Sequence, residues 1–439
     1  MGQKIGLGVL GLVIVGLIFG VRFGLQYLNI ATSYAAKTMC SGVFVAGRTP
    51  EAVLEDLYAV SFVGTQVDTD NKSVSSSLYG LAKSQAIYRP GLGCTLMNGS
   101  SEAELRAQPS PSVSSVKAED FAVMAKNANL EGLLAQTFNP TSSEQNPAPS
   151  NKTRAVVVLQ NGKLLAEKYA DGFNAQTSLL GWSMTKSVTN AMIGMMVLDK
   201  KLEIQKPAPV DEWKNDAKAK ITIDQLLRMS SGLGFVEDYA SPSDATNMLF
   251  RSKGAGAFAI GGKVVAKPDA VWSYSSGTTN ILQEIMRHQF ANHADYLAYP
   301  HTRLFQKLGM TSAILEPDAS GTFVGSSFMY ATARDWAKFG QLYLQDGVWN
   351  NERILPEGWV AYSSSETPHS DGTYAAHFWL AHNDPEFPKD GFMAQGFEGQ
   401  TVAIIPSQKL VIVRLGLTHG DAVYDDAAFV KSVIAALKK

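Results

Sequence analysis

The sequence is poor in cysteine, with only two among its 439 residues. Two cysteines are too few for a Cys-rich zinc module or for a small scaffold held by several disulfides. The chain also lacks an excess of charge of one sign, because 38 Lys and Arg stand against 40 Asp and Glu. A nearly neutral chain has no broad attraction for nucleic acid, so we expect no nucleic-acid partner.

Two catalytic motifs are missing as well. No H-E-x-x-H occurs and the seven histidines are scattered, so we expect no metal site. No G-x-S-x-G occurs, which argues against a Ser-His-Asp hydrolase, although His419 follows a predicted strand. The chain does contain 45% hydrophobic residues, which is enough for a large buried core.

The clearest uncharged run lies near the N-terminus. Residues 5–21 carry no charge, follow Lys4 and precede Arg22. We predict a transmembrane signal-anchor over residues 1–30, which would place the rest of the chain on the extracytoplasmic (periplasmic) side of the membrane. A cleaved signal peptide is the first alternative, because residues 31–36 include small side chains, and a buried core helix is the second.

Export would place Cys40 and Cys94 in an oxidising compartment. An even number of cysteines in such a compartment predicts a disulfide between them. The alternative is that both side chains are small buried hydrophobes. A disulfide between them would stabilise the segment next to the membrane and would take no part in catalysis.

Composition divides the remaining chain into three parts. Residues 31–138 have a mixed pattern and form a predicted membrane-proximal region. Residues 139–152 (NPTSSEQNPAPSNK) are rich in Pro, Ser and Asn and are predicted to be a linker. Residues 153–439 are predicted to form the catalytic domain.

Strand-like runs occur at both ends of residues 153–439. Arg154–Leu159 and Lys163–Tyr169 flank an Asn-Gly dipeptide, a strong hairpin signal, and Thr401–Ile405 and Leu410–Leu417 form a second pair. Helical patterns dominate between the two pairs. We therefore predict an α/β (α+β) fold in which one antiparallel sheet is built from both ends of the domain, flanked by helices and interrupted by a mostly helical subdomain.

Ser183 and Lys186 form the candidate catalytic motif at the start of a predicted helix. Residues at i and i+3 share a helix face, and the helix start offers free backbone N–H groups. A lysine acts as a base only if its surroundings lower its pKa, and the nearly uncharged run after Lys186 predicts that burial. An ordinary helix N-cap is the alternative for Ser183. A second Ser-x-x-Lys, at Ser114–Lys117, has no apolar helix behind it.

Segments on either side of this motif carry a family resemblance. Ile221–Leu233, Val271–Ile285, Phe328–Val360 and Gly396–Pro406 are similar, in the same order, to segments of the serine β-lactamase and penicillin-binding superfamily. The sequence most resembles its class C-like branch, which contains esterases and 6-aminohexanoate-dimer hydrolases. The resemblance implies a serine hydrolase without metal or cofactor that acts on a small-molecule ester or amide.

The resemblance also implies roles for single residues. Ser183 matches the nucleophile, Lys186 its partner, and Tyr274 the general base or proton shuttle, with the Lys186 cation expected to favour a Tyr274 phenolate. Ser276 stands where the family has a substrate-binding Asn. Tyr239 is expected in the substrate pocket, with an exposed loop as the alternative.

The third family motif is altered. Phe397-Glu398-Gly399 is aligned with the family's Lys-Thr-Gly, which places a carboxylate near the position of the missing cation. This change argues against penicillin-like or D-Ala-D-Ala substrates and favours uncharged or cationic ones, unless Glu398 is only a solvated turn residue. The resemblance implies that the backbone N–H groups of Ser183 and Gln400 form the oxyanion hole.

Together these observations predict an exported, membrane-anchored serine hydrolase that cleaves small esters or amides through an acyl-enzyme. The alternative is a non-catalytic wall-binding or sensor protein that retains the fold, which the altered third motif would favour. The sequence gives no indication of the oligomeric state.

Overall fold

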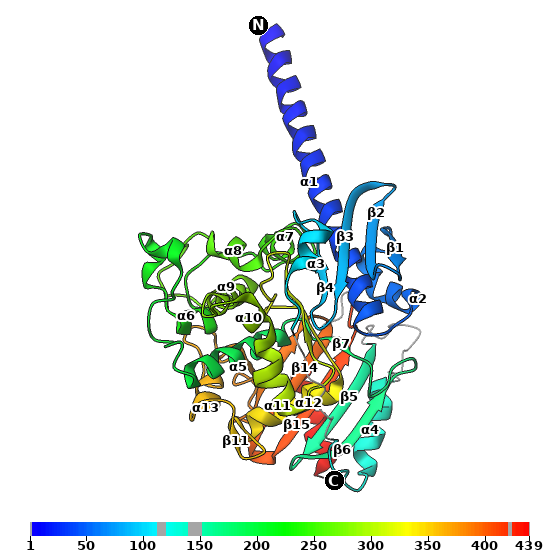
Figure 1. Ribbon diagram of the computed structural model, residues 1–439, viewed down its shortest axis with the longest axis vertical. Helices are drawn as coiled ribbons and strands as arrows, with labels where there is room; N and C mark the ends of the chain where they lie inside the picture. The colour runs from blue at the N-terminus through cyan, green and yellow to red at the C-terminus, as the bar shows by residue number, and fades with distance from the viewer. Residues whose placement is uncertain (1, 112–119, 139–151, 420–423, 439) are drawn as a thin grey trace.

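The computed structural model describes the backbone of residues 2–111, 120–138, 152–419 and 424–438, and it describes side chains from Gly20 onward with the exception of Val21. Figure 1 shows a long N-terminal helix, α1, that projects from a body made of a helical half and a sheet half. The predicted linker at residues 139–152 and the second Ser-x-x-Lys at Ser114–Lys117 lie almost wholly outside the described residues.

The central element is a six-stranded sheet with the order β12-β13-β14-β15-β5-β6. Every neighbouring pair in it is antiparallel, and β15 from the C-terminal end pairs with β5 from the start of the domain. The predicted antiparallel sheet built from both ends of the domain is therefore confirmed. Its strands are β5 (Thr153–Gln160), β6 (Lys163–Tyr169), β12 (Trp379–Leu380), β13 (Phe392–Gly396), β14 (Gln400–Ile405) and β15 (Leu410–Gly416).

Helices cover both faces of this sheet. On one face α4 (Ala128–Phe138) and α14 (Asp426–Leu437) pack together over apolar residues of β5 and β15, including Val156 and Ile412. On the other face lie α5 (Met184–Leu198) and α12 (Ala333–Leu344), which contact β13, β14 and β15. The position of α4 shows that the predicted membrane-proximal region contributes a helix to the catalytic sheet.

The inserted region is mostly helical, as predicted, and occupies the left half of the view in Figure 1. Its buried apolar residues join those of α5 in one core. The helices are α6 (Ile223–Leu227), α7 (Asp244–Phe250), α8 (Ala255–Ile260), α9 (Ser276–Arg287), α10 (His293–Pro300), α11 (Gln306–Leu308) and α13 (Trp359–Ser363), with short turns η2 (Asp211–Trp213), η3 (Ala217–Lys220) and η4 (His301–Phe305). Short strands are β7 (Leu179–Leu180), β8 (Ile314–Leu315), β9 (Met329–Ala331), β10 (Val348–Trp349) and β11 (Glu352–Arg353).

The N-terminal part packs against the body. The second half of α1 (Gly2–Phe44) contacts a four-stranded antiparallel sheet with the order β1-β2-β3-β4. Cys40 on α1 is bonded to Cys94 on β4, with their Cα atoms 6.0 Å apart. The remaining elements of this part are β1 (Gly64–Asp68), β2 (Ser73–Leu78), β3 (Leu81–Arg89), β4 (Gly93–Leu96), α2 (Pro50–Val53), η1 (Leu54–Val60) and α3 (Glu102–Ala107).

The apolar run that predicts a membrane anchor lies in the first half of α1. Almost all side chains of residues 5–21 are outside the described part of the structure. Among the residues that are described, no helix combines the length and the apolar character needed to cross a membrane.

Candidate active site

Ser183 lies at the turn that leads into α5. Trp182 before it has a left-handed backbone (φ 46°), and α5 then begins at Met184. Ser183 is partly exposed, whereas almost all the residues of α5 behind it are buried. Lys186, one turn further on, donates a hydrogen bond from Nζ to Ser183 Oγ at 2.9 Å. The structure therefore brings the predicted nucleophile and its partner into contact.

Lys186 is buried, with 1% of its surface exposed. Its Nζ also donates to Ser276 Oγ at 2.9 Å and to the Ser326 carbonyl oxygen at 3.1 Å. Burial disfavours the charged amine and lowers the pKa of Lys186 to about 8, although the Glu237 carboxylate opposes this shift. A substantial fraction of Lys186 is therefore neutral near pH 8 and able to accept a proton.

Tyr274, the third predicted catalytic residue, lies beside Lys186 and Ser183. Its ring packs under the Lys186 ammonium, with Nζ 4.8 Å from the ring centroid, and it lines the same cavity as Ser183. Burial and the Glu237 carboxylate raise the pKa of Tyr274 well above its usual value, and a hydrogen bond with Ser183 lowers it only in part. This direction favours a neutral phenol that can donate a proton, and the expected phenolate stays a prediction.

Glu237 is a central residue that the sequence did not reveal. It accepts hydrogen bonds from Ser276 N at 2.7 Å, from Ser276 Oγ at 2.5 Å and from the Tyr239 hydroxyl at 2.8 Å. Ser276 is fully buried at the start of α9, so it links Lys186 to Glu237 and does not line the cavity wall. These contacts suit Ser276 to positioning Lys186, and its expected substrate-binding role stays a prediction.

The hairpin between β13 and β14 carries the third motif. A Cβ on Gly396 would lie 2.2 Å from the Gly181 carbonyl oxygen and 3.1 Å from Ser183 N, so only glycine allows this approach to the nucleophile. The Gln400 side chain donates to the Phe397 and Gly416 carbonyl oxygens, at 3.1 and 2.6 Å, and lines a separate small cavity with Trp182, while the oxyanion role expected of its backbone N–H stays a prediction. The glycine beside the Ser183 amide is therefore Gly396. It lies three residues before Gly399, the glycine on which the alignment was based.

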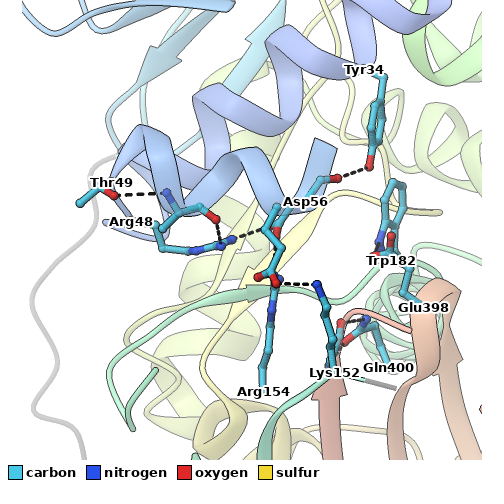
Figure 2. A network of polar contacts seen from close by, with 12 residues as sticks. Tyr34, Arg48, Thr49, Asp56, Lys152, Arg154, Trp182, Glu398 and Gln400 are labelled. Atoms are coloured by element: carbon cyan, nitrogen blue, oxygen red, sulfur yellow. Dashed lines mark hydrogen bonds and ion pairs between the residues drawn. The ribbon is translucent and has the colours of Figure 1, made fainter. Parts of the chain in front are cut away.

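Glu398 lies at the tip of this hairpin with a left-handed backbone (φ 65°). Trp182 Nε1 donates to its Oε2 at 3.1 Å, whereas its Oε1 is shielded from water and has no hydrogen-bond partner of ordinary geometry. Burial raises the pKa of Glu398 to about 8. Figure 2 shows Glu398 directly beside Trp182, so Glu398 is not a solvated turn residue.

Ser183 opens into a cavity of about 370 Å³. The predicted pocket residues Tyr239, Phe397, Glu398 and Gly399 all line it, and the rings of Tyr239 and Phe397 stack at 5.3 Å. Within the described part of the chain, no group of three or more His, Cys, Asp or Glu is arranged to hold a metal ion. The other lining residues are Tyr58, Tyr274, Trp379, Gln395, Gly396, Thr418, His419, Tyr424 and Asp426.

Comparison with known proteins agrees with this geometry. The profile of the Beta-lactamase family matches residues 151–433. The 6-aminohexanoate-dimer hydrolase of Paenarthrobacter ureafaciens is 25% identical over 291 residues, which is 60% of this chain and 72% of that protein.

Solved structures share the fold. A Bacillus anthracis protein provisionally named as a 6-aminohexanoate-dimer hydrolase aligns with a TM-score of 0.59 and 23% identity over 74% of this chain and 86% of its own. EstCE1, a hydrolase with promiscuous acyltransferase activity, aligns with a TM-score of 0.56 and 13% identity over 71% of this chain and 98% of its own.

Proposed function

The chain belongs to the beta-lactamase family, and from this premise we propose that it is a serine hydrolase that cleaves small esters or amides through an acyl-enzyme on Ser183. The observation that carries the proposal is the buried Lys186 amine, 2.9 Å from Ser183 Oγ. A hydroxyl becomes a nucleophile when a base accepts its proton, and an amine with a pKa of about 8 is suited to that step near neutral pH.

In the proposed mechanism, neutral Lys186 takes the proton of Ser183 as Oγ attacks the substrate carbonyl carbon. The resulting oxyanion is held by the backbone N–H of Ser183 and, in our proposal, by that of Phe397, which follows the glycine beside the nucleophile. Tyr274 transfers a proton to the leaving group and is reprotonated by Lys186. Water then attacks the acyl-enzyme by the same route in reverse and releases Ser183.

The relatives support this substrate class. One acts on a 6-aminohexanoate dimer, an amide, and another is a hydrolase with acyltransferase activity. Both names describe carbonyl chemistry of the kind that Ser183 and Lys186 could perform here. A non-catalytic sensor remains the competing proposal, but a sensor has no need for a buried amine aimed at a serine hydroxyl.

We also propose that residues 1–30 anchor the protein in a membrane with the catalytic part on the extracytoplasmic side, and that cleaved secretion is the alternative. The support is the uncharged run at residues 5–21 between Lys4 and Arg22. Fractionation of cells that express the full chain tests this: an integral-membrane fraction is expected, and recovery of a shortened chain in the soluble fraction would favour cleavage.

Hydrolysis of p-nitrophenyl acetate tests the catalytic proposal. We expect Ser183→Ala to lower kcat/KM by at least about a thousandfold while the circular dichroism spectrum stays unchanged. The exposed Ser407→Ala variant is the matched control and should behave as the wild type. Turnover that survives in a folded Ser183→Ala protein would refute the assignment of the nucleophile.

A further inference from the structure

The cavity beside Ser183 has an unusual lining. It contains two carboxyl groups, Glu398 and Asp426, and several aromatic rings. None of its described lining residues is a lysine or an arginine. Such a lining offers no positive charge to an anionic substrate, whereas aromatic faces and carboxyl groups, once ionised, interact favourably with a cationic one.

The nearby cations are engaged elsewhere. Arg154 forms ion pairs with Glu55 at 3.0 Å and with Asp56 at 2.5 Å. Arg414 lies behind the hairpin, where it donates to the carbonyl oxygens of Glu398 and Gly399 at 3.0 and 2.7 Å. Neither guanidinium forms a salt bridge with the Glu398 carboxyl among the described ion pairs, so that group is left without a cationic partner.

The Glu398 carboxyl accepts fewer hydrogen bonds than its two oxygen atoms can hold. Among the described residues, its buried Oε1 has no hydrogen-bond partner of ordinary geometry, whereas Oε2 accepts from the Trp182 indole N–H, and a hydrogen bond with the Tyr58 hydroxyl partly lowers the pKa of the carboxyl. A buried acceptor without a donor is costly, and a ligand N–H group would remove that cost. Burial raises the pKa of Glu398 to about 8, so a cation bound beside it would favour the ionised carboxylate.

A segment outside the family-matched residues covers this carboxyl. Tyr58, on η1, lines the cavity, and its ring stacks on His419 with centroids 4.6 Å apart. Burial, together with the neighbouring Glu398 carboxyl, raises the pKa of Tyr58 to about 12, so its ring is a neutral aromatic surface. Tyr58 lies outside residues 151–433, which carry the family match.

Ion pairs hold η1 in this position (Figure 2). Glu55 accepts from Lys152 Nζ at 2.7 Å and Asp56 pairs with Arg154, both at the start of the catalytic domain. Tyr34 on α1 donates to the Asp56 carbonyl oxygen at 3.1 Å and stacks on Trp182 at 6.5 Å. The N-terminal region is therefore fixed against both the nucleophile turn and the hairpin that carries Glu398.

From this arrangement we propose that Glu398 and Tyr58 form a subsite for a primary ammonium group of the substrate, with the carboxylate accepting its N–H bonds and the Tyr58 ring covering it. The proposal rests on the proposed hydrolase function and adds the substrate class: acyl compounds that carry an aliphatic amine. The N-terminal region then determines specificity as well as supporting the fold.

Competitive inhibition of p-nitrophenyl acetate hydrolysis tests this proposal with three ligands of equal chain length. We expect butylammonium to have a Ki at least about tenfold lower than that of 1-butanol or butyrate, which is the discrimination of one charge-assisted contact. Glu398→Gln should reduce this ratio to near one and Tyr58→Leu should reduce it in part. Glu212→Gln, an exposed acid outside the cavity, is the matched control and should leave the ratio unchanged.

Equal Ki values in the wild type, tighter binding of butyrate, or a preference that survives Glu398→Gln would each overturn the proposal. The midpoint of thermal unfolding of the Ser183→Ala protein gives a second measurement that needs no turnover. Butylammonium should raise this midpoint more than 1-butanol does. An active enzyme without ammonium preference would contradict only the subsite. A chain that does not hydrolyse the ester but is stabilised by butylammonium would contradict only the hydrolase proposal.

Discussion

Lys186 shows how burial can lower the pKa of a common side chain toward the range of a general base. Its amine faces three oxygen atoms but is closed off from water, and the loss of hydration disfavours its charged form. Glu237 acts in the opposite direction and keeps the shift moderate. The balance leaves the pKa close to the pH at which a general base is most useful.

The first prediction concerns pH. Lys186 accepts a proton only when neutral, and its pKa of about 8 lies below the usual value, so the neutral fraction grows as pH rises through 8. We expect kcat/KM for p-nitrophenyl acetate, corrected for spontaneous hydrolysis, to rise about tenfold per pH unit below 8 and to level off above it. A profile that is flat between pH 6 and 9 would contradict the role of Lys186.

The second prediction concerns Glu237. Its carboxylate raises the pKa of both Lys186 and Tyr274. Glu237→Gln removes this negative charge, so we expect the midpoint of the pH profile to move below 8. Asp238→Asn is the control, because the Asp238 carboxyl binds Ser241 and the Ala240 amide instead. A midpoint that stays in place, or moves upward, would show that Glu237 does not act on the base.

Sequence reasoning selected Ser183, Lys186 and Tyr274, which the structure brings together, because these residues lie in recognisable local motifs. Glu237 escaped it because the contact with Ser276 spans 39 residues and depends on how a loop folds back onto α9. The alignment used Gly399, whereas the glycine that lies against Gly181 and the Ser183 amide is Gly396, because both glycines fit the spacing of the motif. Ionisation of Tyr274 depends on burial, which spacing does not express.

At the scale of elements, α1 is bound to the catalytic domain by one buried ion pair. Lys37 on α1 pairs with Glu316, whose side chain is fully buried. Glu316 also accepts from Ser41 Oγ at 2.8 Å and from Cys94 N at 2.6 Å. One carboxylate thus connects α1, β4 and the segment after β8.

The third prediction tests this connection. Lys37→Met leaves the Glu316 carboxylate buried without its cation, so we expect the free energy of unfolding to fall by about 3–5 kcal/mol in urea denaturation. Lys206→Met removes an exposed pair with Glu203 and should cost less than about 1 kcal/mol. If the two variants lost similar stability, the ion pair would not hold α1. Adding Glu316→Gln to Lys37→Met should recover part of the loss.

Elements with strong local patterns could be predicted from the sequence. The expected strands at Arg154–Leu159 and Thr401–Ile405 correspond to β5 and β14 within one residue at each end. The sheet of β1–β4 could not be predicted in this way. Its strand β2 (SVSSSL) is rich in serine, and the sheet packs on α1, a contact that the sequence pattern used to find strands does not show. Hydrophobic periodicity identifies a buried strand, but it does not show which other strand will pair with it.

At the scale of the whole molecule, the N-terminal region and the catalytic domain form one packed body. Composition suggested a region of residues 31–138 separate from the domain, yet α4 covers the catalytic sheet and η1 lines the active-site cavity. A segment rich in Pro and Ser marks a change in composition along the chain. Composition does not show whether the regions on its two sides pack against each other.

The fourth prediction concerns the Cys40–Cys94 bond, which closes a loop of 54 residues between α1 and β4. Replacing both cysteines by alanine should lower the free energy of unfolding by about 2–4 kcal/mol and lower the midpoint of thermal unfolding. Hydrolysis at 25 °C should remain, because neither cysteine lines the cavity beside Ser183. If the double variant were as stable as the oxidised wild type, the bond would not support this region.

The central claim is that Ser183 is an activated nucleophile, and covalent labelling measures it most directly. The wild type is incubated with a fluorophosphonate, and the adduct is located by mass spectrometry of proteolytic peptides, with the Ser183→Ala protein beside it. We predict one adduct per chain, on Ser183, and none in the variant. A folded wild-type protein that takes up no label, or takes it up at another residue, would contradict the claim.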